Sequence, residues 1–489
     1  MTQVSHIDSF IDEGYAKPCQ AFNPYLPSWE YVPDGEPYVF GDRVYIYGSH
    51  DKYNGDVFCL GNFVCWSAPV DDCANWRYEG VIYDKLDEPL NPKGEGMLYA
   101  PDVTVGPDGR YYLYYVCSHI GNVSVAVSDT PAGRYKFYGH VHYEDGTLLG
   151  DAPTDEPQFD PGVLTEGDVT YLYTGFCGQE DASRHGAMCT VLGEDMLTVV
   201  KAPKIVVPSR IYSKGTSFEN HAYFEAASIR KLNGKYIFVY SSEVMHELCY
   251  AVADTPEGEF TYGGVVISNC DLGIDDYKQA SVASAYGANN HGSIIEIKGQ
   301  PYVFYHRHTN GTWYSRQVCA EPLEVSGVCD IKQASVSSCG LNNGPLKACG
   351  YYSAHIVCNI FYPEGEDTLR EDNSCKIPDI TKARVVQDGE DSTECEAYIA
   401  GFTQGAVIGF KYFDCKNVDK ISVYVHGYSH GTMNVHTKWD DKPVGSVEFG
   451  ADNYWKKVEI PVDIEDGVHA IYFTYEGWGS LLIKGFEFE

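Results

Sequence analysis

Short apolar strands rich in tyrosine and broken by glycine turns make up most of the chain. One unit recurs five times, as a turn that contains Gly followed by an apolar strand. Its anchor tyrosines lie 59 to 67 residues apart. They are Tyr45, Tyr112, Tyr171, Tyr236 and Tyr302. Each unit is typical of a hairpin, in which two strands flank a tight turn.

Five hairpin units of about 60 residues fit a five-bladed β-propeller, whose blades are four-stranded sheets around a central channel. The alternative is a chance recurrence of tyrosine-rich hairpins in another all-β fold. The pattern therefore predicts an all-β chain with a five-bladed propeller over residues 1–340.

An ionisable residue stands 10 or 11 positions before each anchor tyrosine. These residues are Asp34, Asp102, Asp160, Glu225 and His291. Because the innermost strand of each blade lines the channel, equivalent positions on five blades should meet near one axis. Carboxylates gathered in a partly dry site raise one another's pKa, which is typical of functional sites. Any one of them alone could equally serve a structural turn.

The last third of the chain has a different pattern. Residues 355–489 alternate apolar and polar positions in short strands, with turn signals about every 10 residues, as in a β-sandwich. Pro and Gly punctuate residues 337–350 ahead of it. We therefore predict a second domain, a jelly-roll-like β-sandwich, over residues 350–489.

Charge narrows the classes of partner. The chain of 489 residues has a formal net charge of −34 and a pI of about 4.7. Such a surface repels nucleic acid and anionic membranes and suits a neutral substrate such as a carbohydrate, although the charge could also serve solubility alone. Apolar runs stay shorter than the ~18 residues of a membrane span.

Cysteine usage and the first residues indicate the compartment. The 17 cysteines are spread thinly and form no C-x-x-C pair, unlike the framework of a secreted disulfide scaffold. Residues 1–15 lack a basic segment followed by an apolar run, so we see no signal peptide. We expect a cytoplasmic protein with reduced thiols.

Several ordered motifs resemble those of glycoside hydrolase family 43. The motifs are Asp34-Gly35-Glu36-Pro37 before a tyrosine-rich strand, Ala100-Pro101-Asp102, Phe224-Glu225-Ala226, and His291-Gly292-Ser293. One departure is Gly35, where family members often carry Asp-Pro at the first motif. Residues 350–489 look like carbohydrate-binding module family 6.

The resemblance implies an inverting, exo-acting glycosidase of the α-L-arabinofuranosidase or β-xylosidase type, active in xylan degradation. It would release terminal L-arabinofuranose or D-xylose from plant-type oligosaccharides. Hydrolysis needs an acid for the leaving oxygen and a base for water. By the resemblance, Asp34 is the base and Glu225 the acid. Asp102 would hold Glu225 and keep its pKa raised.

Further residues are expected to bind substrate, each with a structural alternative. They are His50, Asp51, Asp160, His291, Arg307 and Arg316. The resemblance requires no cofactor for the chemistry, but it allows a structural calcium ion on which His291 would act through water. His291 could instead hydrogen-bond a carboxylate. A homo-oligomer is left open.

Two other functions compete with this interpretation. A non-catalytic carbohydrate-binding propeller would lack the acid and base in register. A retaining fructan hydrolase would carry an Arg-Asp-Pro element, whereas this chain has Phe159-Asp160-Pro161. Other sugars, such as galactofuranose, remain alternatives on the same scaffold. In the tail, Trp439, Tyr454, Trp455 and Trp478 could stack on sugars or pack within the protein, and we expect the tail to buttress the propeller.

Overall fold

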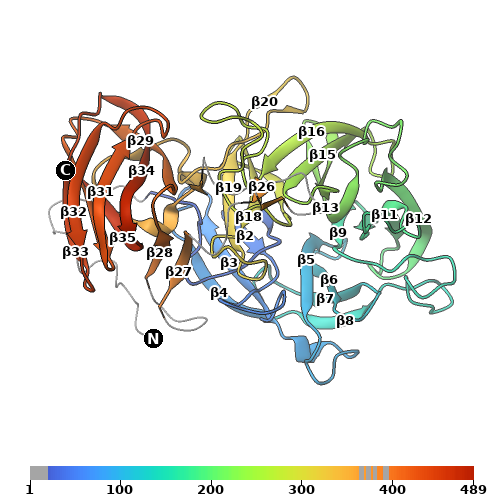
Figure 1. Ribbon diagram of the computed structural model, residues 1–489. Coiled ribbons are helices and arrows are strands. Elements are labelled where there is room, and N and C mark those ends of the chain that lie inside the picture. Colours follow the sequence, from blue (N-terminus) through green and yellow to red (C-terminus); the bar gives the residue numbers. More distant parts are fainter. Residues whose placement is uncertain (1–19, 363–367, 370–375, 378–382, 389–395) are drawn as a thin grey trace.

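The computed structural model describes residues 20–362, 368–369, 376–377, 383–388 and 396–489 (Figure 1). Nearly every element is a strand. The helical segments of these residues are short 3₁₀ turns, namely η2 (Lys85–Asp87), η3 (Gly340–Asn342) and η4 (Ala354–Ile356). None of the described helices is long and apolar enough to cross a membrane.

Residues 36–322 form five antiparallel sheets, each built from strands that are consecutive in sequence. Blade 1 contains β1 (Glu36–Phe40), β2 (Arg43–Tyr47), β3 (Phe63–Pro69) and β4 (Arg77–Tyr83). Blade 2 contains β5 (Leu98–Val105), β6 (Tyr111–Cys117), β7 (Ser124–Ser128) and β8 (Lys136–His140). Blade 3 contains β9 (Gly162–Glu166), β10 (Val169–Thr174), β11 (Gly186–Leu192) and β12 (Val199–Pro208). Blade 4 contains β13 (Tyr223–Leu232), β14 (Lys235–Ser242), β15 (Glu247–Ala253) and β16 (Thr261–Ser268). Blade 5 contains β17 (Ser293–Ile297), β18 (Gln300–Arg307) and β19 (Gln317–Pro322).

These five sheets close into a ring, so the predicted five-bladed propeller is confirmed. The first strand of every blade contacts the first strands of both neighbouring blades, from β1 through β5, β9, β13 and β17 back to β1. Every anchor tyrosine lies in the second strand of its blade, as the repeat predicted. The tyrosine-rich spacing therefore follows from one hairpin per blade.

The N-terminal segment completes the outer edge of blade 5. The Tyr25 N–H donates to the Val318 carbonyl at 3.3 Å. The Asn23 side chain both accepts from the Ala320 N–H at 3.0 Å and donates to the Ala320 carbonyl at 2.9 Å. These bonds run along β19, the outermost strand of a three-stranded blade. The first described residues thus join the end of the propeller to its beginning.

The C-terminal unit is a two-sheet β-sandwich, seen at the red end of Figure 1. One sheet holds β22 (Leu346–Lys347), β24 (Asn359–Phe361), β29 (Val407–Cys415), β31 (Ser429–His436), β32 (Gly445–Ala451) and β34 (Gly467–Gly479). The other holds β23 (Gly350–Ser353), β27 (Arg384–Gln387), β28 (Ala397–Phe402), β30 (Lys420–His426), β33 (Lys456–Pro461) and β35 (Leu481–Phe488). The remaining strands pair as hairpins, β20 (Val325–Ser326) with β21 (Asp330–Ile331) and β25 (Thr368–Leu369) with β26 (Lys376–Ile377). Buried aromatic rings such as Phe410 and Phe486, 4.6 Å apart, fill the space between the two sheets.

Buried polar contacts join the sandwich to the propeller. Lys411 Nζ lies 3.2 Å from Asp271 Oδ2, and both side chains are fully buried. The same ammonium lies 3.7 Å from the centroid of the Tyr277 ring. Trp439 Nε1–H donates to the Tyr277 carbonyl at 2.9 Å. The sandwich is therefore fixed against blades 4 and 5 by a desolvated ion pair.

This ion pair gives a stability prediction. Lys411→Met should lower the free energy of unfolding by about 3–5 kcal/mol, because it leaves the Asp271 carboxylate buried without its cation. Urea denaturation followed by tryptophan fluorescence measures the change. The matched control is Lys420→Met, which removes a partly exposed lysine from Glu459 and Glu489 and should cost less than about 1 kcal/mol. Equal losses in both variants would contradict the buttress role.

Candidate active site

Three of the predicted residues take equivalent places at the channel mouth. Asp34, Asp160 and His291 each precede the innermost strand of a blade, β1, β9 and β17 respectively. In each of these three blades, the residue that pairs with the anchor tyrosine lies four positions after the predicted site residue, Asp34, Asp160 or His291. The common register therefore carries the three side chains to the same level of the ring.

Glu225 reaches this level by a different local structure. It lies in β13, where the pairing with β14 shifts register on both sides of it. Such bulges redirect a side chain and are frequent beside active sites. The next residue, Ala226, has a φ of 66° and donates its N–H to Asp160 Oδ2 at 3.1 Å. The irregular strand thus sets Glu225 beside Asp160.

His291 lies among the carboxylates. Its Nδ1 is 3.6 Å from Asp160 Oδ2 and 3.9 Å from Asp34 Oδ1. Burial lowers the pKa of His291 to about 4, which the charge of Asp34 opposes. The imidazole is therefore neutral near pH 7, so the site holds its acids without a compensating charge from this residue.

Electrostatics separate the roles of the carboxyl groups. Glu225 is partly exposed as a residue. Burial of its carboxyl, followed by the negative charge of Asp34, raises the pKa of Glu225 to about 8. Burial and the charges of Glu225 and Asp34 also raise the pKa of Asp160. Glu225 therefore carries a proton at neutral pH.

Asp34 is held by fixed donors. Arg316 donates from one terminal nitrogen to Asp34 Oδ1 at 2.7 Å. The remaining nitrogens of Arg316 bind both oxygens of Asp51, at 2.7 and 3.0 Å. The Asp34 N–H donates to His306 Nδ1 at 3.3 Å, while His306 Nε2 bonds the Asn289 carbonyl at 2.8 Å. Asp51 and Arg316 thus act on the site through the orientation of Asp34.

Aromatic side chains border the carboxylates. The Arg316 guanidinium lies 4.8 Å from the centroid of Phe58, which packs edge-on against Tyr314. On the other side, Phe159 and Phe224 directly precede Asp160 and Glu225. Both contact Phe176, with ring centroids 5.4 and 5.2 Å away. Phe176 is 40% exposed, so an apolar face lies open beside the acid.

Asp102 does not join this group, and the predicted contact with Glu225 is corrected. The side chain lies inside β5 and is fully buried. One oxygen accepts from the Tyr38 hydroxyl at 2.6 Å and the other from the Val163 N–H at 2.7 Å. Its nearest cation is Arg230, at 3.8 Å. Asp102 therefore belongs to a deeper polar layer of the channel.

An unequal turn length is part of the cause. Four of the innermost hairpins have two-residue turns, whereas blade 2 pairs Val105 with Tyr111 across a five-residue turn. Equal spacing from the anchor tyrosine therefore does not mean equal depth. Asp102 pairs with Tyr114, two positions beyond its anchor tyrosine, which is the level that Glu36 takes opposite Tyr47 in blade 1.

The deeper layer contains two residues that the sequence analysis did not single out. Glu36 pairs with Arg230 and accepts from the Ser228 hydroxyl at 3.1 Å. Burial raises the pKa of Glu36 to about 8, which the charge of Arg230 opposes and that of Asp102 reinforces. Glu36 Oε1 accepts no hydrogen bond from the residues that the structure describes, and it lies 3.9 Å from His291 Nε2. The only available signal was the two-residue spacing from Asp34, which puts both on one face of the strand.

Two predicted substrate ligands also have structural partners. Arg307 is buried and donates to the carbonyls of Val357 and Cys358, at 3.1 and 2.8 Å. It binds the start of the sandwich and not the site, which corrects its prediction. His50 Nε2 bonds Glu30 at 2.8 Å, and its Nδ1 bonds the Asn62 carbonyl at 3.1 Å. Both ring nitrogens of His50 are thus engaged in blade 1.

Comparisons with known proteins match the chain to one family of glycosidases. The sequence profile of glycosyl hydrolases family 43 matches residues 30–328. A xylosidase/arabinosidase from Thermoclostridium stercorarium is 56% identical over 96% of this chain and 98% of that protein. A xylosidase/arabinosidase from Bacteroides ovatus is 30% identical over 62% of this chain and 95% of its own length. The crystal structure of an arabinoxylan arabinofuranohydrolase from Bacillus subtilis shares the fold, with a TM-score of 0.51 at 20% identity over 95% of this chain and 97% of that one.

Proposed function

Because the chain belongs to glycoside hydrolase family 43, we propose that it is an inverting, exo-acting glycosidase. Its substrates are plant-type oligosaccharides from which it releases terminal D-xylose or L-arabinofuranose, the sugars in the names of its relatives. The observation that carries the proposal is the pair of groups at the channel mouth. Glu225 is protonated at neutral pH, and Asp34 is held by Arg316.

The two groups divide the chemistry. Glu225 donates its proton to the glycosidic oxygen as the bond to the anomeric carbon breaks. Asp34 accepts a proton from the water that attacks that carbon from the opposite face. The products are an inverted sugar and a free leaving group. Proton exchange with solvent then returns Glu225 to the acid and Asp34 to the carboxylate.

Asp160 takes the role that the sequence analysis gave to Asp102. It lies beside Glu225 through the Ala226 bond, and the negative charges of the two carboxyl groups oppose each other. Since like charges favour the protonated form, the pair keeps a proton that the leaving group can receive. Asp160 is therefore a positioning residue for the acid.

Paired asparagine variants test this exchange of roles. Asp160→Asn removes the second carboxyl of this coupled pair, so we expect kcat to fall by ~10²-fold and the alkaline limb of the kcat/KM profile, which the pair sets, to move to lower pH. Asp102→Asn should leave that limb in place and reduce thermal stability, because it weakens the bonds to Tyr38 and Val163. The pH profiles and the melting temperatures of both variants decide the matter. If the alkaline limb moves only in Asp102→Asn, then Asp102 and not Asp160 positions the acid, as the sequence predicted.

The reaction itself is tested with a panel of nitrophenyl glycosides. We expect hydrolysis of the β-D-xylopyranoside and the α-L-arabinofuranoside, with NMR at early times showing the inverted anomer. Cleavage of a galactofuranoside alone would change the sugar but keep the chemistry. Binding without hydrolysis of any glycoside would favour the non-catalytic carbohydrate-binding propeller.

No cofactor is needed for these proton transfers, but the channel could hold a calcium ion. The free oxygen of Glu36 faces His291, and calcium prefers carboxylate and water oxygens. Glu36 would bind the ion directly and His291 through water. The ion would supply fixed positive charge below the carboxylates and take no part in a bond-breaking step.

The sandwich is proposed to act mainly as a buttress. Trp439 packs edge-on against Phe361 and bonds the propeller, and Trp455 packs against Tyr398. Only two of the four aromatic residues considered for sugar stacking are largely exposed, Tyr454 and Trp478, at 59% and 65%. A cytoplasmic location, where small oligosaccharides are the substrates, fits a domain that supports the site.

A further inference from the structure

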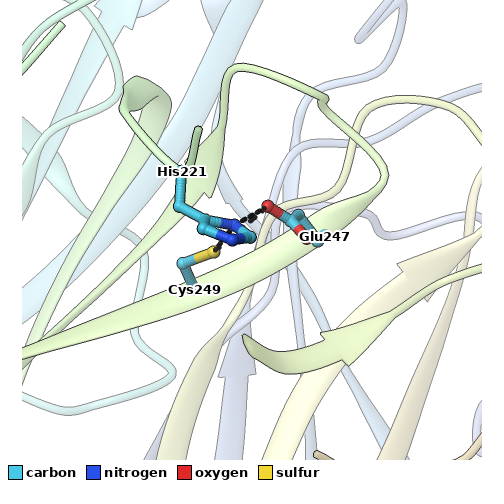
Figure 2. Close-up of side chains that lie close together, drawn as sticks. All are labelled: His221, Glu247 and Cys249. Carbon is cyan, nitrogen blue, oxygen red and sulfur yellow. Dashed lines mark hydrogen bonds and ion pairs between the residues drawn. The ribbon is translucent and has the colours of Figure 1, made fainter. Parts of the chain in front are cut away.

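Blade 4 contains a second cluster of reactive side chains, outside the carboxylate site (Figure 2). His221 lies just before β13, and Glu247 and Cys249 lie two residues apart on β15. Figure 2 shows the three side chains pointing toward one another. His221 Nδ1 is 2.7 Å from Glu247 Oε1, and Cys249 Sγ is 3.4 Å from that oxygen and 4.0 Å from that nitrogen.

These separations suit one small cation. Bond lengths of about 2.0–2.3 Å in a tetrahedral zinc site place the ligand atoms about 3.3–3.6 Å apart. Of the three observed separations, one lies below that range, one within it and one above it, so adjustments of about 0.6 Å or less would satisfy it. A thiol, an imidazole and a carboxylate together favour Zn²⁺ over the hard cations Ca²⁺ and Mg²⁺.

The cluster is held in place by its neighbours. The Tyr262 ring stacks on His221 with centroids 4.7 Å apart and an interplanar angle of 12°. The Ser242 hydroxyl donates to Glu247 Oε1 at 2.6 Å. Such outer contacts fix the orientation of metal ligands. Little side-chain freedom would therefore be lost when an ion binds.

The cluster is also reachable from solvent. A groove of about 480 Å³ opens beside it, lined in part by His221, Glu243, His246 and Glu247. The His221 side chain is 34% exposed, whereas Cys249 lies fully buried behind it. The groove offers an entry path and room for a water molecule as a fourth ligand.

We propose that His221, Glu247 and Cys249 bind one Zn²⁺ ion, with water from the groove as the fourth ligand. Binding forms one bond from the metal to each side chain and releases the thiol proton of Cys249 to solvent. It also displaces the proton that His221 Nδ1 donates to Glu247 Oε1, so that the imidazole keeps a proton only on Nε2. The ion would join the segment before β13 to β15. Since Glu225 lies four residues after His221, the site would stabilise the strand that carries the acid.

Cobalt substitution of the full-length protein tests the proposal. Co²⁺ takes the place of Zn²⁺ and reports a thiolate ligand as a charge-transfer band in the near ultraviolet. We expect the band to saturate at one Co²⁺ per chain and to disappear when Zn²⁺ is added. Zn²⁺ should also raise the melting temperature of the wild-type protein, because it binds the folded state.

Matched variants locate the band. His221→Gln and Cys249→Ala should each abolish the band and the melting shift. Cys349→Ser, which removes an exposed thiol of the sandwich, should change neither. Wild-type protein without the band, or a band that survives in Cys249→Ala, would overturn the proposal. Two independent variants, His221→Gln and Cys249→Ala, locate the band, so poor folding of one of them would not obscure the result, and hydrolytic activity plays no part in it.

Discussion

Asp34→Asn is expected to abolish turnover for every glycoside, whatever its leaving group. Water must lose a proton to Asp34 as it attacks, and this step is common to all substrates. Loss of a general base costs ~10²–10⁴-fold in rate, and kcat on an aryl xyloside and on xylobiose should fall equally. The amide keeps the size of the carboxylate and an oxygen for Arg316, so the protein should stay folded.

Azide and a neighbouring aspartate supply the controls for this experiment. Azide needs no base, so it should restore some turnover of the activated substrate and yield a glycosyl azide of inverted configuration. Asp51→Asn keeps Asp34 but loosens its Arg316 partner, so its loss should be smaller than that of Asp34→Asn. A wild-type product of retained configuration would contradict the inverting assignment.

The ring and three of its channel residues were predictable from the sequence because both depend on local pattern. Each blade begins with a hairpin, and a hairpin can be recognised in the sequence by a turn next to an apolar strand. In blades 1, 3 and 5 the anchor tyrosine pairs with the residue seven positions before it, so the distance from the anchor fixes the depth of the upstream side chain. Asp34, Asp160 and His291 follow that rule.

Asp102 shows where such counting fails. Its turn is three residues longer, and Asp102 lies only two positions before the residue that pairs with Tyr112, whereas Asp34 lies four positions before the partner of Tyr45. Side chains two positions apart share one face of a strand, which is why Asp102 still points into the channel. It meets Glu36 and Arg230 there, a contact between blades that no local pattern reveals.

The contacts between the sandwich and the propeller could also not be predicted from the sequence. Arg307 was expected to bind substrate, yet its neighbour His306 is the residue that reaches the site, because adjacent residues of a strand face opposite ways. His306 bonds Asp34, whereas Arg307 bonds Val357 and Cys358 on the other side. The strand β18 therefore connects the base to the sandwich. Substitutions that disturb the sandwich should therefore affect the active site through this strand.

Glu225→Gln should have the most selective effect of the active-site variants. An acid is needed when the leaving group is a sugar hydroxyl, but not when it is an activated phenol. We expect kcat/KM on xylobiose to fall by ~10²–10⁴-fold and that on an activated nitrophenyl xyloside to fall far less. The glutamine matches glutamate in size, and circular dichroism should confirm the fold.

The pH profile gives the same residue a second test. Glu225 acts only while protonated, and its pKa is raised to about 8 by burial and by the charge of Asp34. Activity of the wild type on xylobiose should therefore persist through neutral pH and decline above about pH 8, as the carboxylate forms. In Glu225→Gln this alkaline limb should vanish, because the group that titrates is gone. If the limb remains and both substrates slow equally, the proton comes from another residue.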